Sequence, residues 1–336
     1  MKKLAVAAAL SLCALSATAS NFRGADQVYI PAAGNFQGAS GRFVSDVYLA
    51  NLTDSEVDVS VIFQQIGQGG GAGTEFKNII TLRPHERKEY KNFLASGLGL
   101  NAGNEFGQLI FNGCLKGASC GVETQDQNGN SPNYRAISAT SRVYSFPTAP
   151  GANQSLTNGQ LFTGIPWYHF VSSLQSANGL DKVFIPGLRQ TGDPGTAGTY
   201  RSNIGLVNAS QWSSTTIVVT LYQGTMTVAD RKGEYQVELG PLGSIQPGFT
   251  AMFPGITGEN FFVTVEQRNS IPVPPFPPSC SNGCPAFLAY GSILDNGTGD
   301  ATTLEAQYLN ALRNEAIVII YPNATGGTGM MRSVRH

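Results

Sequence analysis

The chain has few charged residues and few histidines. Asp, Glu, Lys and Arg make up 13% of its 336 residues, against roughly 25% in an average soluble protein. The formal net charge is −1, so there is no basic field to hold nucleic acid or an anionic membrane. The histidines are His85, His169 and His336, and none lies in a G-x-S-x-G context. These shortages argue against nucleic-acid binding and against histidine-assisted nucleophilic catalysis.

Long apolar runs are missing after the first residues. A basic start precedes the apolar run Leu4–Leu15, and Ala17–Ala19 provide the A-x-A of a cleavage site. This pattern is typical of a secretory signal peptide, and the run is too short for an ordinary membrane span. The longest later run, Ala316–Tyr321, has the length of a strand. We therefore predict a secreted or periplasmic protein, with association at the cell surface as an option and no membrane insertion.

Only four cysteines remain after the predicted cleavage near Ala19. Cys114 and Cys120 flank one short loop, and Cys280 and Cys284 flank another. Four cysteines permit three pairings. We predict the two local disulfides, because each pair occupies the same place in a repeat and export favours oxidation. A metal site would need further thiolate or imidazole ligands, so no metal or other cofactor is expected.

What the sequence does contain is glycine, 40 residues in all, together with short segments in which apolar and polar residues alternate. Alternation with a period of two is typical of half-buried strands. The one helix candidate is Leu304–Ala316. The composition indicates an all-β, turn-rich protein.

Two distant segments nearly repeat each other. Val28–Thr53 reads VYIPAAGNFQGASGRFVSDVYLANLT, and Val183–Ser210 reads VFIPGLRQTGDPGTAGTYRSNIGLVNAS. Four more matching pairs follow in the same order: Val59–Gln65 with Val218–Gly224, Ile80–Glu86 with Val237–Gly243, Phe106–Asn112 with Phe261–Gln267, and Arg135–Ser145 with Ala286–Asn296. The spacing is far longer than the roughly 20–50 residues of a solenoid repeat. It indicates a duplicated whole domain.

Each copy offers short strands separated by Gly, Asn and Pro turns, which is typical of an Ig-like antiparallel β-sandwich. A closed barrel is the structural alternative. The predicted fold is all-β, with two tandem Ig-like β-sandwich domains from an internal duplication. The predicted divisions are a signal peptide at 1–19, a first sandwich at 22–147, a linker at 148–164, a second sandwich with a C-terminal extension at 165–322 and a flexible tail at 323–336.

The motifs RFVSDVYLANLT, TYRSNIGLVNAS, NGQLFTGIP and AYGSILDNGTGDAT resemble tandem Ig-like modules of exported, largely uncharacterised bacterial proteins of Acidobacteria-like organisms. The resemblance covers about residues 25–303. It implies an exported, non-catalytic protein made of several sandwiches, and it supplies no active site to carry over.

The repeated motif carries polar residues at matching positions, Ser45, Asp46 and Asn51 in the first copy and Ser202, Asn203 and Asn208 in the second. A catalytic role would need Asp46 as an acid or base, yet the second copy has Asn203, which cannot ionise. Ser, Asp and Asn at strand ends commonly bond to the backbone of bends. We predict that the motif is scaffold.

Two acidic turns could carry chemistry. Glu123 and Asp126 lie in one, and Asp295 and Asp300 lie in the other beside Asn296. Paired carboxylates serve glycoside hydrolysis, and the oxygens of the second turn could bind Ca²⁺, although the EF-hand spacing is absent. We predict solvated turns, with a calcium site at the second turn and a carbohydrate-active enzyme as alternatives.

Aromatic residues are the candidates for ligand contact. Trp167, Tyr168 and Phe170 follow Pro166, and Trp212 lies in a polar turn. Exposed rings could stack on a glycan or anchor a protein partner. We expect the first three to fill the groove between the two sandwiches, with a binding surface as the alternative.

The sequence therefore predicts a non-enzymatic binding or structural module that presents loops on two rigid sandwiches, with a protein or glycan partner that it does not identify. A self-assembling surface subunit is the alternative, in which Ala316–Pro322 would complete the sheet of a neighbouring copy. The same segment could instead pair within its own domain and cover a sheet edge.

Overall fold

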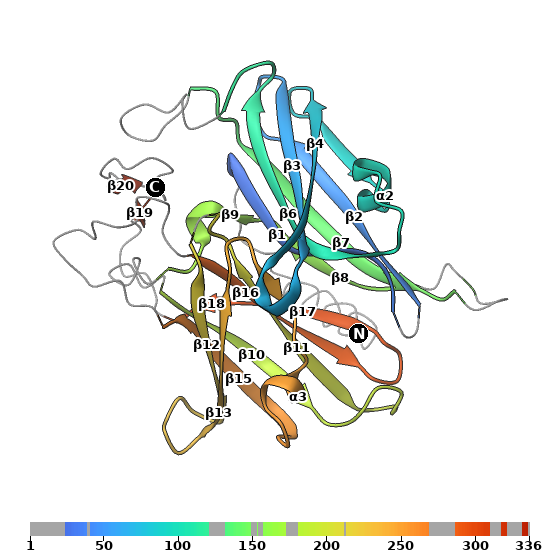
Figure 1. Ribbon diagram of the computed structural model, residues 1–336, viewed down its shortest axis with the longest axis vertical. Coiled ribbons are helices and arrows are strands. Elements are labelled where there is room, and N and C mark those ends of the chain that lie inside the picture. Colours follow the sequence, from blue (N-terminus) through green and yellow to red (C-terminus); the bar gives the residue numbers. More distant parts are fainter. Residues whose placement is uncertain are drawn as a thin grey trace, which may run out of the picture.

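The computed structural model describes residues 24–38, 41–120, 132–148, 153, 157–172, 181–211, 213–268, 286–309, 317–320 and 331–334. Its architecture is all-β, and the paired strands are antiparallel in several sheets, an arrangement consistent with β-sandwiches. Two groups of strands, called here the first and second halves, lie one above the other in Figure 1. Among the helices of the described residues, none is long and apolar enough to cross a membrane.

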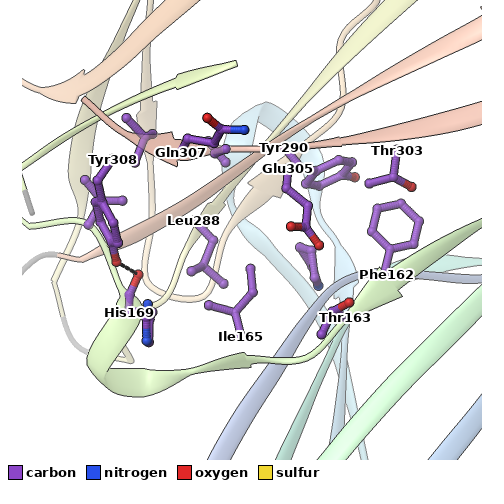
Figure 2. A pocket seen from close by; sticks show the side chains of 15 residues that line it. Phe162, Thr163, Ile165, His169, Leu288, Tyr290, Thr303, Glu305, Gln307 and Tyr308 are labelled. Carbon is purple, nitrogen blue, oxygen red and sulfur yellow. Dashed lines mark hydrogen bonds between the residues drawn. The ribbon is translucent and has the colours of Figure 1, made fainter. Parts of the chain in front are cut away.

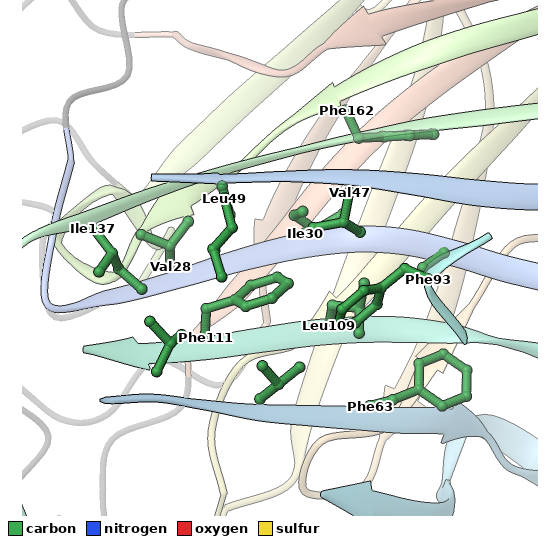
Figure 3. Packing of buried hydrophobic residues seen from close by; sticks show 14 of the residues in the cluster. Val28, Ile30, Val47, Leu49, Phe63, Phe93, Leu109, Phe111, Ile137 and Phe162 are labelled. Atoms are coloured by element: carbon green, nitrogen blue, oxygen red, sulfur yellow. The ribbon is translucent and has the colours of Figure 1, made fainter. Parts of the chain in front are cut away.

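The first half contains nine strands: β1 (Gln27–Gln37), β2 (Arg42–Asn51), β3 (Val57–Ile66), β4 (Ala72–Leu82), β5 (Arg87–Tyr90), β6 (Asn104–Leu115), β7 (Ile137–Phe146), β8 (Asn158–Thr163) and β9 (Ile165–Pro166). Their order is β4-β3-β6-β1-β2-β7-β8, with β5 on β2 and β9 on β1. The core lies between facing strands. Figure 3 shows Val47 and Leu49 of β2 directed toward the layer that holds Leu109 and Phe111.

The second half contains nine further strands: β10 (Lys182–Gln190), β11 (Tyr200–Asn208), β12 (Thr215–Gln223), β13 (Arg231–Leu239), β14 (Ser244–Ile245), β15 (Gly258–Gln267), β16 (Phe287–Asp295), β17 (Ala301–Glu305) and β18 (Gln307–Tyr308). They form two sheets, β13-β12-β15-β10-β18 and β14-β11-β16-β17. Strand for strand, these orders match β4-β3-β6-β1-β9 and β5-β2-β7-β8 of the first half. A second buried core fills the space between them.

Both halves have an irregularity at the same place. The pairing of β1 with β6 shifts register between Ile30 and Ala33, and that of β10 with β15 shifts between Ile185 and Leu188. A proline follows the isoleucine in each strand. Proline cannot donate to a ladder and is tolerated in strands at bulges. The repeated I-P dipeptide therefore marks a shared bend of the first strand.

Each half also has a short helix, which the sequence analysis did not predict. These helices are α2 (Phe93–Leu98) and α3 (Phe249–Met252). Their first residues, Phe93 and Phe249, are fully buried. Such helices are too short to display a 3.6-residue period, so the hydrophobic pattern could not reveal them.

The predicted linker and the predicted helix are both wrong in part. Asn158–Thr163 of the linker form β8, which pairs with β7, and its alternating side chains place Phe162 in the core and Leu161 outside. The first half thus continues past residue 147. The expected helix at Leu304–Ala316 begins instead with strand residues of β17 and β18, because Ala301–Glu305 pair along the edge of β16.

The segment near the C-terminus contains a strand, as predicted. β19 (Ile317–Ile320) pairs with β20 (Met331–Val334) in a two-stranded sheet. β20 lies within residues 323–336, the predicted tail, and the flexibility of that tail stays a prediction. Within the described residues, β19 takes its hydrogen-bonded neighbour from the same chain.

The predicted disulfide between Cys114 and Cys120 is confirmed. It joins the end of β6 to the loop that follows, with a sequence separation of 6. Cys280 and Cys284 lie outside the described residues, so their predicted bond stays a prediction.

The double substitution Cys114→Ser/Cys120→Ser is expected to lower the free energy of unfolding by about 2 kcal/mol, because closing so short a loop removes only a small part of the entropy of the unfolded chain. Denaturant unfolding of the oxidised chain measures this. The single variants, whose free thiol can exchange, are less suitable. An unchanged unfolding midpoint in the double variant would contradict the expected contribution.

Candidate functional site

The repeated motif makes the same contacts in both halves. The Ser45 Oγ accepts a hydrogen bond from the Gly34 backbone N–H at 2.8 Å. The Ser202 Oγ accepts one from the Arg189 N–H at 2.9 Å. Both serines are buried, so each ties its strand to the bulged first strand of its half.

The two asparagines of the motif are bonded alike. The Asn51 Nδ2 donates to the carbonyls of Ser55 and Arg83 at 2.7 and 2.9 Å. The Asn208 Nδ2 donates to those of Ser213 and Gly240, both at 2.8 Å. Each Oδ1 also accepts an N–H two residues onward, at 2.9 Å. Together with the serine contacts, these bonds confirm that the motif is scaffold.

Asp46 is buried and serves the same framework. Its Oδ1 accepts from the Asn92 N–H at 2.9 Å, and its Oδ2 lies 3.1 Å from the Lys91 Nζ. The carboxylate thus holds the turn before α2. In the second half, the backbone of Asn203 forms an isolated β-bridge with Gly248, the residue before α3. A Cβ on Gly248 would lie 3.6 Å from the Asn203 Oδ1, so the uncharged side chain lies beside the corresponding turn.

The polar side chains of the candidate calcium residues already form hydrogen bonds within the protein. The Asp295 Oδ1 accepts the N–H groups of Gly297 and Thr298 at 2.8 and 2.9 Å, and these bonds lower the pKa of the carboxyl. Asp300 accepts from the Ala301 N–H, and buried Asn296 donates to the Gly192 carbonyl and the Thr199 hydroxyl in the loop between β10 and β11. Within the described residues, no group of three His, Cys, Asp or Glu side chains could hold a metal ion. The contacts are those of a turn.

Three other candidates, Glu123, Asp126 and Trp212, lie outside the described residues. The geometry of a carboxylate pair at the first acidic turn, and the exposure of the second tryptophan, therefore stay predictions.

Trp167, Tyr168 and Phe170 lie where the two halves meet. The Phe170 ring packs edge-on against Tyr29, with centroids 4.7 Å apart, and is buried. The Trp167 Nε1 donates to Asp26 at 2.8 Å, and the rings of Trp167 and Tyr168 pack against the first core. Phe170 thus fills the groove between the halves, as expected, and the alternative of an exposed stacking surface is wrong for it.

A continuous apolar contact joins the halves. Tyr29 and Ile110 of the first half form one buried cluster with residues of the second half, Phe170, Val207, Ala209 and Leu288. Hydrogen bonds to backbone carbonyls also link the two halves. The Gln108 Nε2 donates to the Leu242 carbonyl at 2.9 Å, and the Gly240 N–H donates to the Gly70 carbonyl at 3.1 Å.

Beside this contact lies a half-open cavity of about 370 Å³, at the low end of the roughly 300–1,000 Å³ typical of ligand pockets. Strands β8 and β9 and the 3₁₀ turn η4 (Trp167–His169) border it from one side, and β16, β17 and β18 border it from the other. Figure 2 shows Ile165 and Leu288 forming an apolar region between these borders.

Two polar groups of the cavity, the Tyr308 hydroxyl and the Glu305 carboxylate, differ in their hydrogen bonding. The Tyr308 hydroxyl donates to the His169 carbonyl, as the dashed line in Figure 2 marks. Glu305 is directed from β17 across the cavity toward the segment of Thr163 and Ile165. Within the described part of the chain, no ion pair or hydrogen bond engages its carboxylate.

Aromatic rings line the same space. Phe162 meets Tyr290 edge-on, with centroids 5.2 Å apart. Burial raises the pKa of the Tyr290 and Tyr308 phenols, so both stay neutral at physiological pH. The cavity therefore combines apolar and aromatic walls with a single carboxylate.

A difference between the halves explains the location of the cavity. In the first half, β8 passes to β9 through Gly164, whose N–H donates to the Ala139 carbonyl at 2.9 Å. A Cβ on Gly164 would lie 2.5 Å from that oxygen and 2.3 Å from Val28, so only glycine permits this approach. The corresponding residue between β17 and β18 is Ala306, which lines the cavity instead.

The sequence analysis missed Glu305, Tyr290 and Phe162. A comparison of equivalent strand positions in the two halves could have identified Glu305 and Tyr290. By strand register, Glu305 corresponds to Thr163 and Tyr290 to Thr140, so a carboxylate and an aromatic ring replace hydroxyls at equivalent places. Residues that differ at equivalent places of two halves with matching strand orders are candidates for contact with a ligand or an interface.

The comparisons with known proteins identify no relative. No family model matches the chain, and no curated protein matches it. The BSP domain of a biofilm-associated protein aligns with 86% of this chain at 10% identity and a TM-score of 0.18, and this chain spans 60% of its length. The structure of Broad Bean Stain Virus aligns with 88% of this chain and 93% of its own, at 9% identity and a TM-score of 0.20. Neither score establishes a shared fold.

Proposed function

We propose that this protein is an exported, non-enzymatic binding module in which two tandem Ig-like β-sandwiches, derived by duplication, are held as one rigid unit. The identical strand orders of the halves support the duplication, as do the repeated serine and asparagine contacts. The observation that carries the function is the apolar contact between the halves, which leaves a lined cavity at its margin. Ligand sites are commonly found at such domain interfaces.

The acidic turn that contains Asp295 and Asp300, and the disulfide between Cys114 and Cys120, are consistent with this proposal. The described carboxylates of the second turn bind their own backbone amides, which supports a structural role. A disulfide in a short loop is typical of exported proteins. Export would follow from the predicted signal peptide, and the partner would be met outside the cytoplasm.

Separating the halves tests the proposal. Leu288→Asp places a charge in the buried contact, where Leu288 is 2% exposed. Burying an unpaired charge is strongly unfavourable, so we expect the halves to come apart and the radius of gyration to increase. Leu161→Asp, at a side chain 56% exposed on β8, should leave it unchanged.

Small-angle and light scattering over a wide concentration range provide the measurement, since together they give the radius of gyration and the mass. A rigid binding module predicts a constant mass and an extended form only for Leu288→Asp. Equal radii for the two variants would contradict the rigid junction. A mass that rises with concentration would instead favour the self-assembling subunit.

A further inference from the structure

We propose that the cavity between the halves binds an organic cation, an ammonium group on an apolar or aromatic body. The inference rests on the proposed function, because the cavity exists only while the halves stay in contact. Glu305 is the one carboxylate among its lining residues, alongside the apolar Ile165, Val171 and Leu288.

The charge of Glu305 decides the sign of the ligand. Its carboxylate faces the cavity (Figure 2) and has no cationic neighbour within ion-pair distance among the described residues. Glu305 is exposed, so solvent screens its charge, and its attraction for an opposite charge and repulsion of a like one are modest. An ammonium group within reach of Glu305 would be stabilised, and a carboxylate would be repelled.

The walls determine the body of the ligand. Phe162 and Tyr290 lie together on one side of the cavity, and Tyr308 lies on the opposite side (Figure 2). Aromatic faces attract cations and bury apolar groups, whereas the volume of about 370 Å³ admits only a small molecule or a single side chain. An aromatic amine carries a positive charge, has an apolar ring to bury and is small enough for the cavity.

Three probes of nearly equal shape separate charge from size. They are 2-phenylethylamine, 2-phenylethanol and 3-phenylpropanoate, titrated into the oxidised chain at low salt and followed by calorimetry or NMR. Glu305 is exposed, so its ion pair is screened and contributes at most about 1 kcal/mol, or about fivefold in affinity. We expect the amine to bind about fivefold more tightly than the alcohol, and the carboxylate to bind most weakly.

Two pairs of variants locate the site. Glu305→Gln should remove the preference for the amine, whereas Glu259→Gln, at an exposed residue outside the cavity, should keep it. Ala306→Phe fills the cavity and should abolish binding of all three probes. Thr302→Phe, at an exposed position of the neighbouring strand β17 that does not line the cavity, should not.

The outcomes distinguish this inference from the proposed function. No binding, or an amine preference that survives Glu305→Gln, overturns the inference. Equal affinities that Ala306→Phe abolishes overturn the cationic class and keep the cavity as a binding site. The scattering of Leu288→Asp is independent of any probe, and it alone decides whether the halves form a rigid unit.

Discussion

Replacing Phe93 by alanine is expected to lower the free energy of unfolding by about 3–5 kcal/mol, the range for removing a buried phenylalanine. The Phe93 side chain is fully buried at the start of α2. Its ring lies edge-on to Tyr90, with centroids 5.5 Å apart, and 6.2 Å from Phe111. The truncation would leave a cavity between the layers and detach the helix that covers one end of the core.

Denaturant unfolding of the whole chain, followed by circular dichroism, measures the loss. Ile79→Ala is the control, because Ile79 is 66% exposed on β4 and its truncation removes little buried surface. A change of less than about 1 kcal/mol for Phe93→Ala would mean that the helix is not anchored by this ring. Phe249→Ala, at the corresponding residue of α3, should reproduce the loss in the second half.

Replacing Asn208 by leucine is expected to cost about 3 kcal/mol or more. Its side chain is fully buried and makes four backbone contacts, to Ser210, Ser213, Leu239 and Gly240. Each bond contributes about 1 kcal/mol, and a buried group left without a partner costs a further 1–3 kcal/mol or so. Leucine has a similar volume, so the effect comes from the lost hydrogen bonds.

Thermal and denaturant unfolding of three variants provide the test. Asn51→Leu should match Asn208→Leu, since the two side chains have corresponding partners. Asn101→Leu should change little, because this exposed residue makes a single bond of 3.3 Å to Gly99. If Asn208→Leu behaved like Asn101→Leu, the motif could not be the framework that we describe.

Local features of the fold were predictable because their causes are local. Alternation identified most strands, the I-P dipeptide marked a bend in both halves, and the absence of a charge at Asn203 separated scaffold from catalysis. The short spacing of Cys114 and Cys120 indicated their bond. Each of these signals lies within a few neighbouring residues or in the comparison of the two copies.

The cavity could not be predicted in the same way. Its walls combine Phe162 and Ile165 with Leu288 and Glu305, residues more than 120 positions apart in the chain. Their approach depends on how one half packs on the other, and no single segment encodes this. The expected linker was mistaken for a different reason, because the pairing of β8 with β7 within the first half overrode a composition rich in Gly and Asn.

The contact between the halves also affects whether separate molecules can stack into filaments. Leu288 and Tyr290 of β16 correspond by register to Ser138 and Thr140 of β7, which pair with Ala50 and Tyr48. Head-to-tail stacking of separate molecules through the same geometry would bury those hydroxyls against an apolar sheet. A heterologous contact that does not close generates filaments, and the two hydroxyl side chains make that contact unfavourable. The difference between the halves at these positions thus places the apolar surface inward, within one molecule.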